Sequence, residues 1–371
     1  MAKNVYPMHM PGHKRNIDHS HYILPFDIDI TEIHDFDDLH NPQGILLETQ
    51  QLAAKIYGSN RAYALVNGST VGILSAIGAH TKRGDKILIA NNHHWSVDNA
   101  VELFGLKSVE IHSAADGLSG IEGSIDPAVV EQMLDENPDI KLVVITSPSY
   151  EGVVSNIASI AAIVHAHNLV LLVDSAHGAH LGFSGVFPKS AIQAGADIVI
   201  MSMHKTLPCM TQCSLLHLCT SRAKADETQK MLSMLQTSSP SYVLLASIDT
   251  CLHTLNTDHV QLFSEYERNL ERFGDEIHSL KKLNVLCHTY NINHLFFDFD
   301  PGKIVIVTKN SAISGIELAQ TLRTEYSIEL EKAVEDYAIA MTSICDSMEG
   351  LDRFAKALLE IDRKLPERDV C

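Results

Sequence analysis

Lys205 occupies a position in the sequence that suggests chemistry. It comes almost immediately after the strand-like run DIVIMS (197–202), with His204 before it and Pro208 shortly after it. A lysine amine is a nucleophile toward aldehydes and other carbonyl groups. Most single lysines are nevertheless solvated surface residues. Lys205 alone therefore does not indicate a catalytic site. Only its combination with other polar residues at strand ends would.

An earlier loop predicts an anion site. In VNGSTVGILSAIGA (66–79), a strand runs through Gly68, Ser69 and Thr70 into a helical pattern. Gly68 lets the backbone come close to a ligand, the next two residues offer hydroxyls and N–H groups, and the helix dipole favours negative charge. A phosphate would fit there. The alternative is an ordinary helix N-cap, for which Ser and Thr are favoured.

Asp174 lies at the end of an apolar strand, within VDSAHGAH (173–180). A carboxylate at the end of a buried strand is costly unless it meets a cation or a strong hydrogen-bond donor. We therefore expect Asp174 to face a positively charged or protonated group.

Two pairs of histidines raise the question of a metal site. His177 and His180 are three residues apart, and His93 and His94 are adjacent. The chain as a whole is rich in histidine, with 21, and it contains neither an HExxH motif nor paired CxxC motifs. The sequence therefore favours a site without metal.

The phosphate loop, Asp174 and Lys205 follow one another in an order that a single cofactor explains. The loop comes early in the expected sheet, Asp174 ends a middle strand, and Lys205 follows a later strand about thirty residues on. Pyridoxal phosphate needs an anion site for its phosphate, an acid that keeps its pyridine nitrogen protonated, and an amine for its aldehyde. The ordered combination therefore predicts a pyridoxal-phosphate site.

The elements that must position these residues are typical of an α/β protein. From residue 60 to about 220, short β-branched runs alternate with helical stretches, which predicts a largely parallel sheet covered on both faces. Such sheets bind ligands at the carboxyl ends of their strands. The expected strands are AYALV (62–66), KILIA (86–90), LVVITS (142–147), LVLLVD (169–174) and DIVIMS (197–202), with helices over 70–82 and 127–137.

The rest of the chain predicts a second, smaller domain. A long helical region over roughly 222–283 leads into shorter patterns that are typical of an α+β domain. We expect an N-terminal arm over 1–50, a large domain over 51–250, and a linking helix with the small domain over 251–371. The patterns are VLCHTY (285–290), HLFFDFD (294–300), SGIELAQTLRTEY (314–326), AIAMTSIC (338–345) and MEGLDRFAKALLEI (348–361).

The composition excludes some function classes. The chain has 371 residues, of which 45% are hydrophobic and 20% charged, as in ordinary globular proteins. Its net charge of −18 argues against binding to nucleic acid or anionic membranes. Without a long apolar run, a secretory signal or a disulfide framework among its seven cysteines, the chain is predicted to be cytoplasmic.

With these residues identified, the sequence resembles the bacterial Orn/Lys/Arg decarboxylases. These are pyridoxal-phosphate enzymes of the aspartate-aminotransferase fold, type I, and the resemblance implies a seven-stranded type of mainly parallel sheet. Their motifs keep their order over nearly the whole chain. They are PMHMPGHKR (7–15), DITEIHDFDDLHNPQG (29–44), LVNGSTVGI (65–73), NNHHWSV (91–97), SPSYEGV (147–153), VDSAHGAHLGF (173–183), SMHKTLPCMTQ (202–212) and DPGKIVIVTKNSAISGIEL (300–318).

The resemblance implies a role for each matching residue. Lys205 would bind the cofactor aldehyde as a Schiff base, and Asp174 would pair with the pyridinium nitrogen. His94 would stack on the ring, while Ala176 and His177 would line its other face. The remaining implied contacts are to the phosphate, from Ser69, Thr70 and Ser202, and to cofactor or substrate, from His204.

The implied reaction is decarboxylation of a basic amino acid, with two alternatives. One is another reaction of this fold type, catalysed by an aminotransferase, lyase or aldolase. The other is a non-catalytic paralogue that binds the cofactor, because the chain ends sooner than larger family members and is expected to lack their C-terminal domain. It also begins almost at the MPGHK motif, and Trp95 stands where a lysine is common.

Charged residues bear on the reaction and its substrate. Many aminotransferases of this fold hold the substrate carboxylate with an arginine from the small domain, and AIAMTSIC offers none, which favours decarboxylation.

The sequence leaves lysine, ornithine and arginine open as substrates, and the resemblance implies at least a homodimer. The small-domain arginines are Arg323, Arg353, Arg363 and Arg368, and the candidate acids for the substrate's distal cation are Asp35, Asp37, Asp38 and Glu151.

Overall fold

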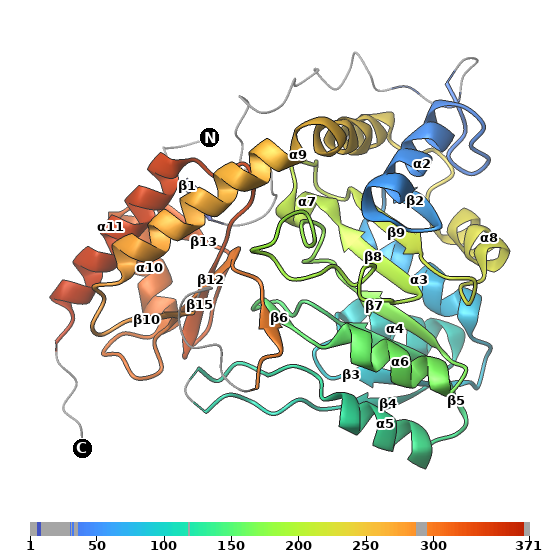
Figure 1. Cartoon of the computed structure of the whole chain (residues 1–371), viewed down its shortest axis with the longest axis horizontal. Helices are drawn as coiled ribbons and strands as arrows, with labels where there is room; N and C mark the ends of the chain where they lie inside the picture. The colour runs from blue at the N-terminus through green and yellow to red at the C-terminus, as the bar shows by residue number, and fades with distance from the viewer. Residues whose placement is uncertain are drawn as a thin grey trace.

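A computed structural model describes residues 6–8, 30, 32, 36–117, 119–286 and 295–366 of the chain. Two sheet regions lie side by side, the larger at the right of Figure 1 and the smaller at the left. The long helix α9 (Tyr242–Ile277) runs from one to the other along the top of the view. Of the motif MHMPGHK (8–14), only Met8 is among the described residues.

The large sheet has seven strands in the order β2-β9-β8-β7-β5-β3-β4. Strand β9 pairs antiparallel with both of its neighbours, and the remaining pairs in the sheet are parallel. The predicted α/β class with a mainly parallel sheet is therefore confirmed. The strands are β2 (Arg61–Leu65), β3 (Lys86–Ala90), β4 (Lys107–Ile111), β5 (Ile140–Thr146), β7 (Val170–Asp174), β8 (Ile198–Ser202) and β9 (Ser214–Leu218).

Helices cover both faces of this sheet, as its apolar strands require. Side chains alternate along a strand, so Ile87 and Ile89 pack into one core and Leu88 and Ala90 into the other. Each fully buried aliphatic side chain contributes about 1.5–3 kcal/mol. The first core lies under α3 (Gly68–His80), α4 (Trp95–Phe104) and α8 (Ala225–Leu235), and the second under α2 (Ile45–Tyr57), α5 (Pro127–Glu136), α6 (Ile157–Ala166) and the start of α9.

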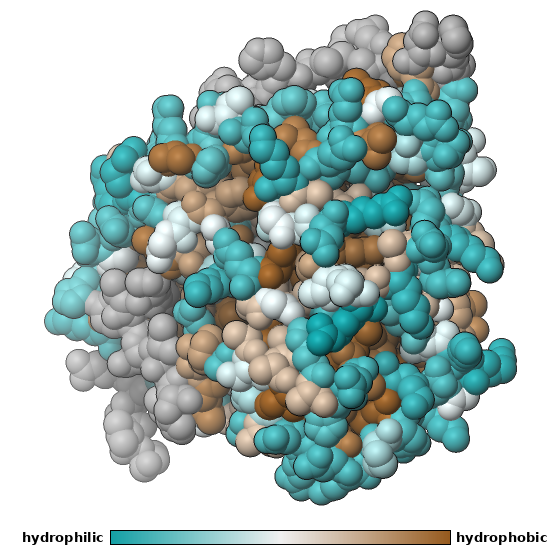
Figure 2. Space-filling view, turned by 45° about the vertical axis from the view of Figure 1, so that its right-hand side comes forward, coloured by the Kyte–Doolittle hydropathy of each residue, from teal (hydrophilic) through white to brown (hydrophobic). Residues whose placement is uncertain are grey.

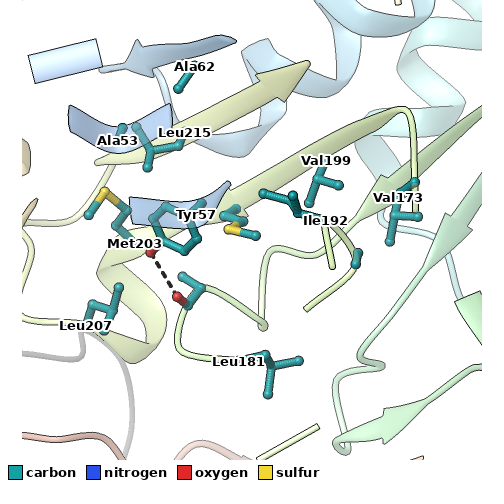
Figure 3. Packing of buried hydrophobic residues seen from close by; sticks show 14 of the residues in the cluster. Ala53, Tyr57, Ala62, Val173, Leu181, Ile192, Val199, Met203, Leu207 and Leu215 are labelled. Atoms are coloured by element: carbon teal, nitrogen blue, oxygen red, sulfur yellow. Dashed lines mark hydrogen bonds between the residues drawn. The ribbon is translucent and has the colours of Figure 1, made fainter. Parts of the chain in front are cut away.

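Tyr57 on α2 links the second core to the loop that follows β7. Figure 3 shows its ring among apolar side chains that include Leu181 and Met203. Its hydroxyl donates a hydrogen bond of 2.9 Å to the backbone oxygen of Ala179, drawn as the dashed line. Because that loop also carries Asp174's neighbours, the buried bond helps to fix a segment that forms the candidate site.

The smaller sheet is antiparallel, in the order β10-β12-β15-β14. Ile304 and Ile306 of β12 pack under α10, α11 and the end of α9, whereas Val305 and Val307 face the opposite way. Lys303 shares the parity of the second pair and is therefore directed toward the large sheet region. The elements are β10 (Asn284–Leu286), β12 (Lys303–Val307), β14 (Lys332–Ala333), β15 (Tyr337–Met341), α10 (Gly315–Glu325) and α11 (Met348–Lys364).

Short strand pairs connect distant parts of the chain. β6 (Val153–Val154) pairs antiparallel with β11 (Asp298–Phe299), which joins the large sheet region to the small one. β1 (Tyr6–Met8) pairs in parallel with β13 (Ile328–Leu330). The two regions are thus connected by backbone hydrogen bonds as well as by α9.

Some element boundaries differ from the sequence prediction. The single helical region expected over 222–283 is two helices, α8 and α9, because the segment 236–241 contains Pro240. Sequence analysis did not single out α2, α4, α6, β4 or β9. Residues 287–290 of VLCHTY lie outside the described residues, as does residue 294 of HLFFDFD. The expected domain boundary at 250 falls within α9 and stays a prediction.

The surface shown in Figure 2 is mostly hydrophilic, with hydrophobic residues exposed in patches between hydrophilic ones. In the described part of the chain, no helix combines the length and the apolar composition that crossing a membrane requires. The cytoplasmic location predicted from the sequence stays a prediction.

Replacing Tyr57 by Phe is expected to lower the free energy of unfolding by about 1–3 kcal/mol, because the buried backbone oxygen of Ala179 loses its donor. Urea unfolding of the purified protein measures the change. The matched control is Tyr326→Phe, whose hydroxyl meets the exposed Lys364 and should contribute almost nothing. Equal losses in the two variants would contradict the role given to the Tyr57 bond.

Candidate active site

One cavity of about 640 Å³ opens at the carboxyl ends of the large sheet's strands. The structure brings every site residue predicted from the sequence to its wall, although they come from four separate segments of the chain. This is the arrangement expected of a ligand site in a parallel α/β sheet. The ten residues are Gly68, Ser69, Thr70, His94, Asp174, Ala176, His177, Ser202, His204 and Lys205.

Hydroxyl groups form one end of the cavity. Ser69 lies in the first turn of α3 and Ser202 ends β8, and their Oγ atoms lie 2.6 Å apart in a hydrogen bond. Ser69 Oγ also donates to Ser214 Oγ at 3.3 Å. Gly68 adopts φ +73°, a conformation that glycine tolerates best, and so turns the chain from β2 into α3. Hydroxyls at the N-terminus of a helix suit a phosphate.

Asp174, the last residue of β7, forms the floor of the cavity. Its side chain is 3% exposed, and its Oδ1 accepts a hydrogen bond of 3.1 Å from the Ala176 N–H. Burial raises the pKa of this carboxyl group, and the charges of Lys205 and His94 only partly oppose that effect. The carboxylate is therefore in a position where an additional cation or donor would stabilise it.

Lys205 lies on the single turn α7 (Met203–Thr206), directly after β8. Its Nζ is 3.0 Å from Nε2 of His177, on the loop after the neighbouring strand β7. Burial lowers the pKa of the Lys205 amine, although the carboxylates of Asp174 and Glu331 act in the opposite direction. A lowered pKa increases the neutral fraction of the amine, the form that attacks an aldehyde.

Two further histidines present neutral rings to the cavity. His94 is the N-cap of α4, and its Nδ1 accepts a hydrogen bond of 3.2 Å from the Ser96 N–H. His204 donates from Nδ1 to the backbone oxygen of Cys213 at 2.9 Å, which leaves Nε2 as an acceptor. Burial lowers the pKa of both rings. Both are therefore suited to contact a flat, polar ligand without adding charge.

The cavity wall also contains residues that sequence reasoning missed. Among the described residues, Thr146 Oγ1 and Asn92 Oδ1 are buried polar atoms of this wall without a hydrogen-bond partner. Such atoms are rare in folded proteins and indicate a place for a polar ligand. Tyr150 and Gln212 line it too, the latter at φ +81°. Thr146 and Tyr150 lie near the end of an expected strand, and this position was the sequence signal that could have identified them as site residues.

The histidines considered as metal ligands have other partners. His180 Nε2 lies 3.0 Å from Oδ1 of Asp300, and His93 Nε2 lies 2.9 Å from Oδ1 of Asp98. In the part of the chain that the structure describes, His, Cys, Asp and Glu side chains do not gather in groups of three that could hold a metal ion.

The acids considered for the substrate's distal cation are occupied elsewhere. Asp37 accepts hydrogen bonds from the backbone N–H groups of residues 38, 43, 44 and 46. Asp38 accepts one from the His40 N–H. Glu151 binds Lys332 Nζ at 2.9 Å and the Tyr337 hydroxyl at 2.8 Å. Asp35 lies outside the described residues, and Asp174 is the single carboxylate among the described residues of the cavity wall.

The described arginines of the small sheet region do not line the cavity. Arg353 donates to the backbone oxygen of Tyr326 at 2.6 Å, and Arg323 pairs with Glu329 at 3.4 Å. Arg363 belongs to the last turn of α11, and Arg368 lies outside the described residues. No arginine occurs among the described residues that line the cavity.

Known proteins resemble this chain in sequence and structure. A family model described as Orn/Lys/Arg decarboxylase, major domain, matches residues 4–340. An arginine decarboxylase of Bacillus subtilis is 33% identical over 375 residues, 100% of this chain and 76% of that protein. The uncharacterized protein YaaO of B. subtilis is 40% identical over 346 residues, 91% of this chain and 70% of that protein.

Solved structures show the fold. Lysine decarboxylase A from Pseudomonas aeruginosa superimposes with a TM-score of 0.76 at 17% identity, over 96% of this chain and 60% of that one. At such low identity the likeness concerns the fold alone, and it confirms the predicted type I fold of pyridoxal-phosphate enzymes.

Replacing Asp174 by Asn is expected to stabilise the cofactor-free protein. Because burial raises the pKa of this carboxyl group above its unfolded-state value, the ionised form costs stability at neutral pH, and the cost disappears as the pH falls through the folded pKa. The free energy of unfolding in urea should rise by on the order of 1 kcal/mol at neutral pH and by less in acid.

Asp300→Asn is the matched control, with the opposite expected sign. Burial alone would raise the pKa of Asp300, but His180, the charge of Lys303 and the Gly302 N–H outweigh it and hold the pKa low. Its carboxylate therefore stabilises the fold at neutral pH, and this contribution is lost as the pH falls through the folded pKa. If Asp174→Asn also loses stability, Asp174 already has a sufficient partner in the protein.

Proposed function

The chain belongs to the Orn/Lys/Arg decarboxylase family, and we propose that it removes CO2 from arginine in the cavity around Lys205, with pyridoxal phosphate as its cofactor. The predicted family and its class of reaction, decarboxylation of a basic amino acid, are confirmed. The choice of arginine rests on the curated relative of that name, 33% identical. One observation supports the site most strongly: an amine, a buried carboxylate and a hydroxyl cradle line one cavity.

The residues of the cavity fit the proposed cofactor. Ser69, Thr70 and Ser202 would hold its phosphate, since their hydroxyls gather at a helix N-terminus. Asp174 would pair with the cofactor's ring nitrogen, and Lys205 would bind its aldehyde. The unpartnered polar atoms of the wall support the presence of a polar ligand. When bound, pyridoxal phosphate supplies a conjugated ring that accepts the electron pair left behind as CO2 departs.

Asp174 would act electrostatically. A carboxylate whose pKa is raised by burial gains stability from a proton held on the ring nitrogen beside it. Holding that proton keeps the ring electron-deficient, and a fixed charge in a buried site needs no reorganisation during the reaction. The neutral ring of His94 would cover one face of the cofactor, and Ala176 and His177 would cover the other.

Lys205 would have two tasks. Its neutral amine would anchor the cofactor before substrate binds, and would afterwards be free to hold a proton near the substrate's Cα. His204 lies next to it on α7, with Nε2 available as an acceptor. These two residues are therefore our candidates for delivering the proton that replaces CO2 on the substrate's Cα.

The alternatives named from the sequence have less support. A transaminase would keep its substrate carboxylate, for which a cavity arginine would be the natural partner, and the described wall has none. A non-catalytic paralogue that binds the cofactor would use the same residues, but the relative named arginine decarboxylase, which is 33% identical, favours an active enzyme. We further propose a homodimer, because Trp95 at the cavity is 59% exposed and a second chain would bury it.

The purified protein with pyridoxal phosphate is expected to release CO2 from arginine in preference to lysine and ornithine. Borohydride should attach the cofactor permanently to the peptide that contains Lys205, as mass spectrometry would detect. Lys205→Ala should lose both properties, because the variant lacks the amine. If CO2 is released from free lysine alone, the substrate is lysine and not arginine. Attachment of the cofactor to a lysine residue other than Lys205 would contradict the proposed site.

Asp174→Asn, although expected to be more stable, should decarboxylate at least roughly 10²-fold more slowly, since the amide cannot hold a proton on the ring nitrogen by charge. Steady-state kcat with arginine measures the loss. Asp98→Asn, which removes an exposed carboxylate paired with His93, is the control and should keep most of the activity. An unchanged kcat in Asp174→Asn would contradict the catalytic role proposed for Asp174.

A further inference from the structure

The cavity wall has no evident partner for the far end of a cationic substrate. A charged group in a partly buried site is costly unless an opposite charge lies near it. Among the described residues that line the cavity, Asp174 is the single carboxylate, and the proposed cofactor would occupy it. Asp37, Asp38 and Glu151 have partners elsewhere. A carboxylate directly behind the wall would supply the missing charge.

Glu331 is such a carboxylate. It follows β13 in the small sheet region, and its Oε1 accepts a hydrogen bond of 2.5 Å from the hydroxyl of Tyr150, which lines the cavity. Its charge also reaches the cavity. Burial lowers the pKa of the Lys205 amine, and Asp174 and Glu331 are the carboxylates that oppose this effect. A positive charge in this part of the cavity is therefore attracted by Glu331.

Tyr150 lies close to the amine that would bind the cofactor. The centroids of its ring and the His177 ring are 4.7 Å apart, and Nε2 of His177 lies 3.0 Å from Nζ of Lys205. One imidazole ring thus separates the phenol from the Lys205 amine. The side chain of an arginine whose α-amine is held near Lys205 is long enough to span that separation.

The bond to Glu331 leaves the phenolic oxygen of Tyr150 as an acceptor. Burial and the charge of Glu331 raise the pKa of this phenol, so the hydroxyl keeps its proton and donates it to the carboxylate. The oxygen retains its lone pairs, and donation to a carboxylate strengthens it as an acceptor. A guanidinium group only donates hydrogen bonds. A phenolic oxygen with a carboxylate behind it is therefore complementary to a guanidinium group.

The cations already near the Tyr150 ring have carboxylates close to them. Nζ of Lys332 lies 5.0 Å from the ring centroid and 2.9 Å from Oε1 of Glu151. Nζ of Lys303, whose side chain is 1% exposed, lies 5.7 Å from the centroid. Burial lowers the pKa of Lys303 to about 7, and Asp300 is the carboxylate that opposes this most strongly. These lysines therefore do not add an unopposed positive charge that would repel a guanidinium group.

We propose that Tyr150 binds the guanidinium group of the substrate through its phenolic oxygen. Glu331 acts through Tyr150 as a positioning residue, which orients the phenol and supplies the negative charge behind it. Tyr150 is then the residue that determines specificity for a cation at the far end of the substrate. This inference rests on the proposed function, in which arginine binds in this cavity.

Two matched ligands test the inference. Agmatine, the product of arginine decarboxylation, and N-carbamoylputrescine have the same chain and the same primary amine. Agmatine ends in a guanidinium group, whereas N-carbamoylputrescine ends in a neutral urea group. Calorimetry with the protein loaded with pyridoxal phosphate measures both dissociation constants. The wild-type protein should bind agmatine more tightly by roughly 10- to 100-fold, the range expected of a hydrogen bond to a charged group.

Two variants that keep the shape of the side chain should remove this preference. Glu331→Gln loses the charge and Tyr150→Phe loses the phenolic oxygen, so each should bind the two ligands almost equally. The double variant should lose no more than either single variant, because both residues act on the same group of the ligand. The matched control is Glu329→Gln, since Glu329 also belongs to β13 but pairs with Arg323 at 3.4 Å. It should keep the wild-type preference.

A purely structural effect is separated by the cofactor and by the common amine. Borohydride should still attach pyridoxal phosphate to Lys205 in every variant, which shows that the cofactor site is intact. Because both ligands carry the same amine, damage to the amine site would weaken both and leave their ratio unchanged. In the active enzyme, Glu331→Gln should raise KM for arginine more than it lowers kcat, since the guanidinium group takes no part in the reaction.

The outcomes distinguish this inference from the proposed function, because binding of these ligands requires no decarboxylation. A wild-type protein without a preference for agmatine, or a preference that persists in both Glu331→Gln and Tyr150→Phe, would overturn the inference even if CO2 is released from arginine. Loss of the preference in only one of the two variants would overturn the role given to the other residue. Loss in both would support the inference even if no CO2 is released.

Discussion

The candidate site depends on keeping a carboxyl group and an amine out of water at the carboxyl edge of a parallel sheet. Asp174 ends β7 and Lys205 follows β8, so neighbouring strands bring a carboxylate and an amine into one cavity. Burial raises the pKa of the first and lowers the pKa of the second. Both groups are thereby left in states that a complementary ligand would stabilise. A site of this kind is costly for the empty protein and favourable for the loaded one.

The two sheet regions meet at this site through His177. The ring comes from the loop after β7, and its two nitrogens contact an amine from the large sheet region and an amine from the small one. The Tyr150 hydroxyl adds a second connection, a 2.5 Å hydrogen bond to Glu331. The small sheet region therefore places charged groups near the site, although none of its described residues lines the cavity.

Sequence reasoning identified the parts of the site that depend on local pattern. Lys205, Asp174 and Ser69 each lie at the end of an apolar strand or shortly after it, and in a parallel sheet such strand ends lie along one edge. It did not identify Lys303, which lies 126 residues from His177, because their contact depends on tertiary packing of β12. Nothing in KIVIV signals a buried amine, since a lysine at the start of a strand is usually solvated. The strand β9 was also missed, because the periodicity of a short apolar run such as SLLHL does not distinguish a strand from a buried helical segment.

A crystal structure of the protein grown with pyridoxal phosphate would test the central claim most directly. The account predicts continuous density from Nζ of Lys205 to the cofactor, with the ring nitrogen beside Asp174 and the phosphate between Ser69 and Ser202. Cofactor bound elsewhere, or bound with its ring nitrogen away from Asp174, would contradict the assignment of the cavity as the active site.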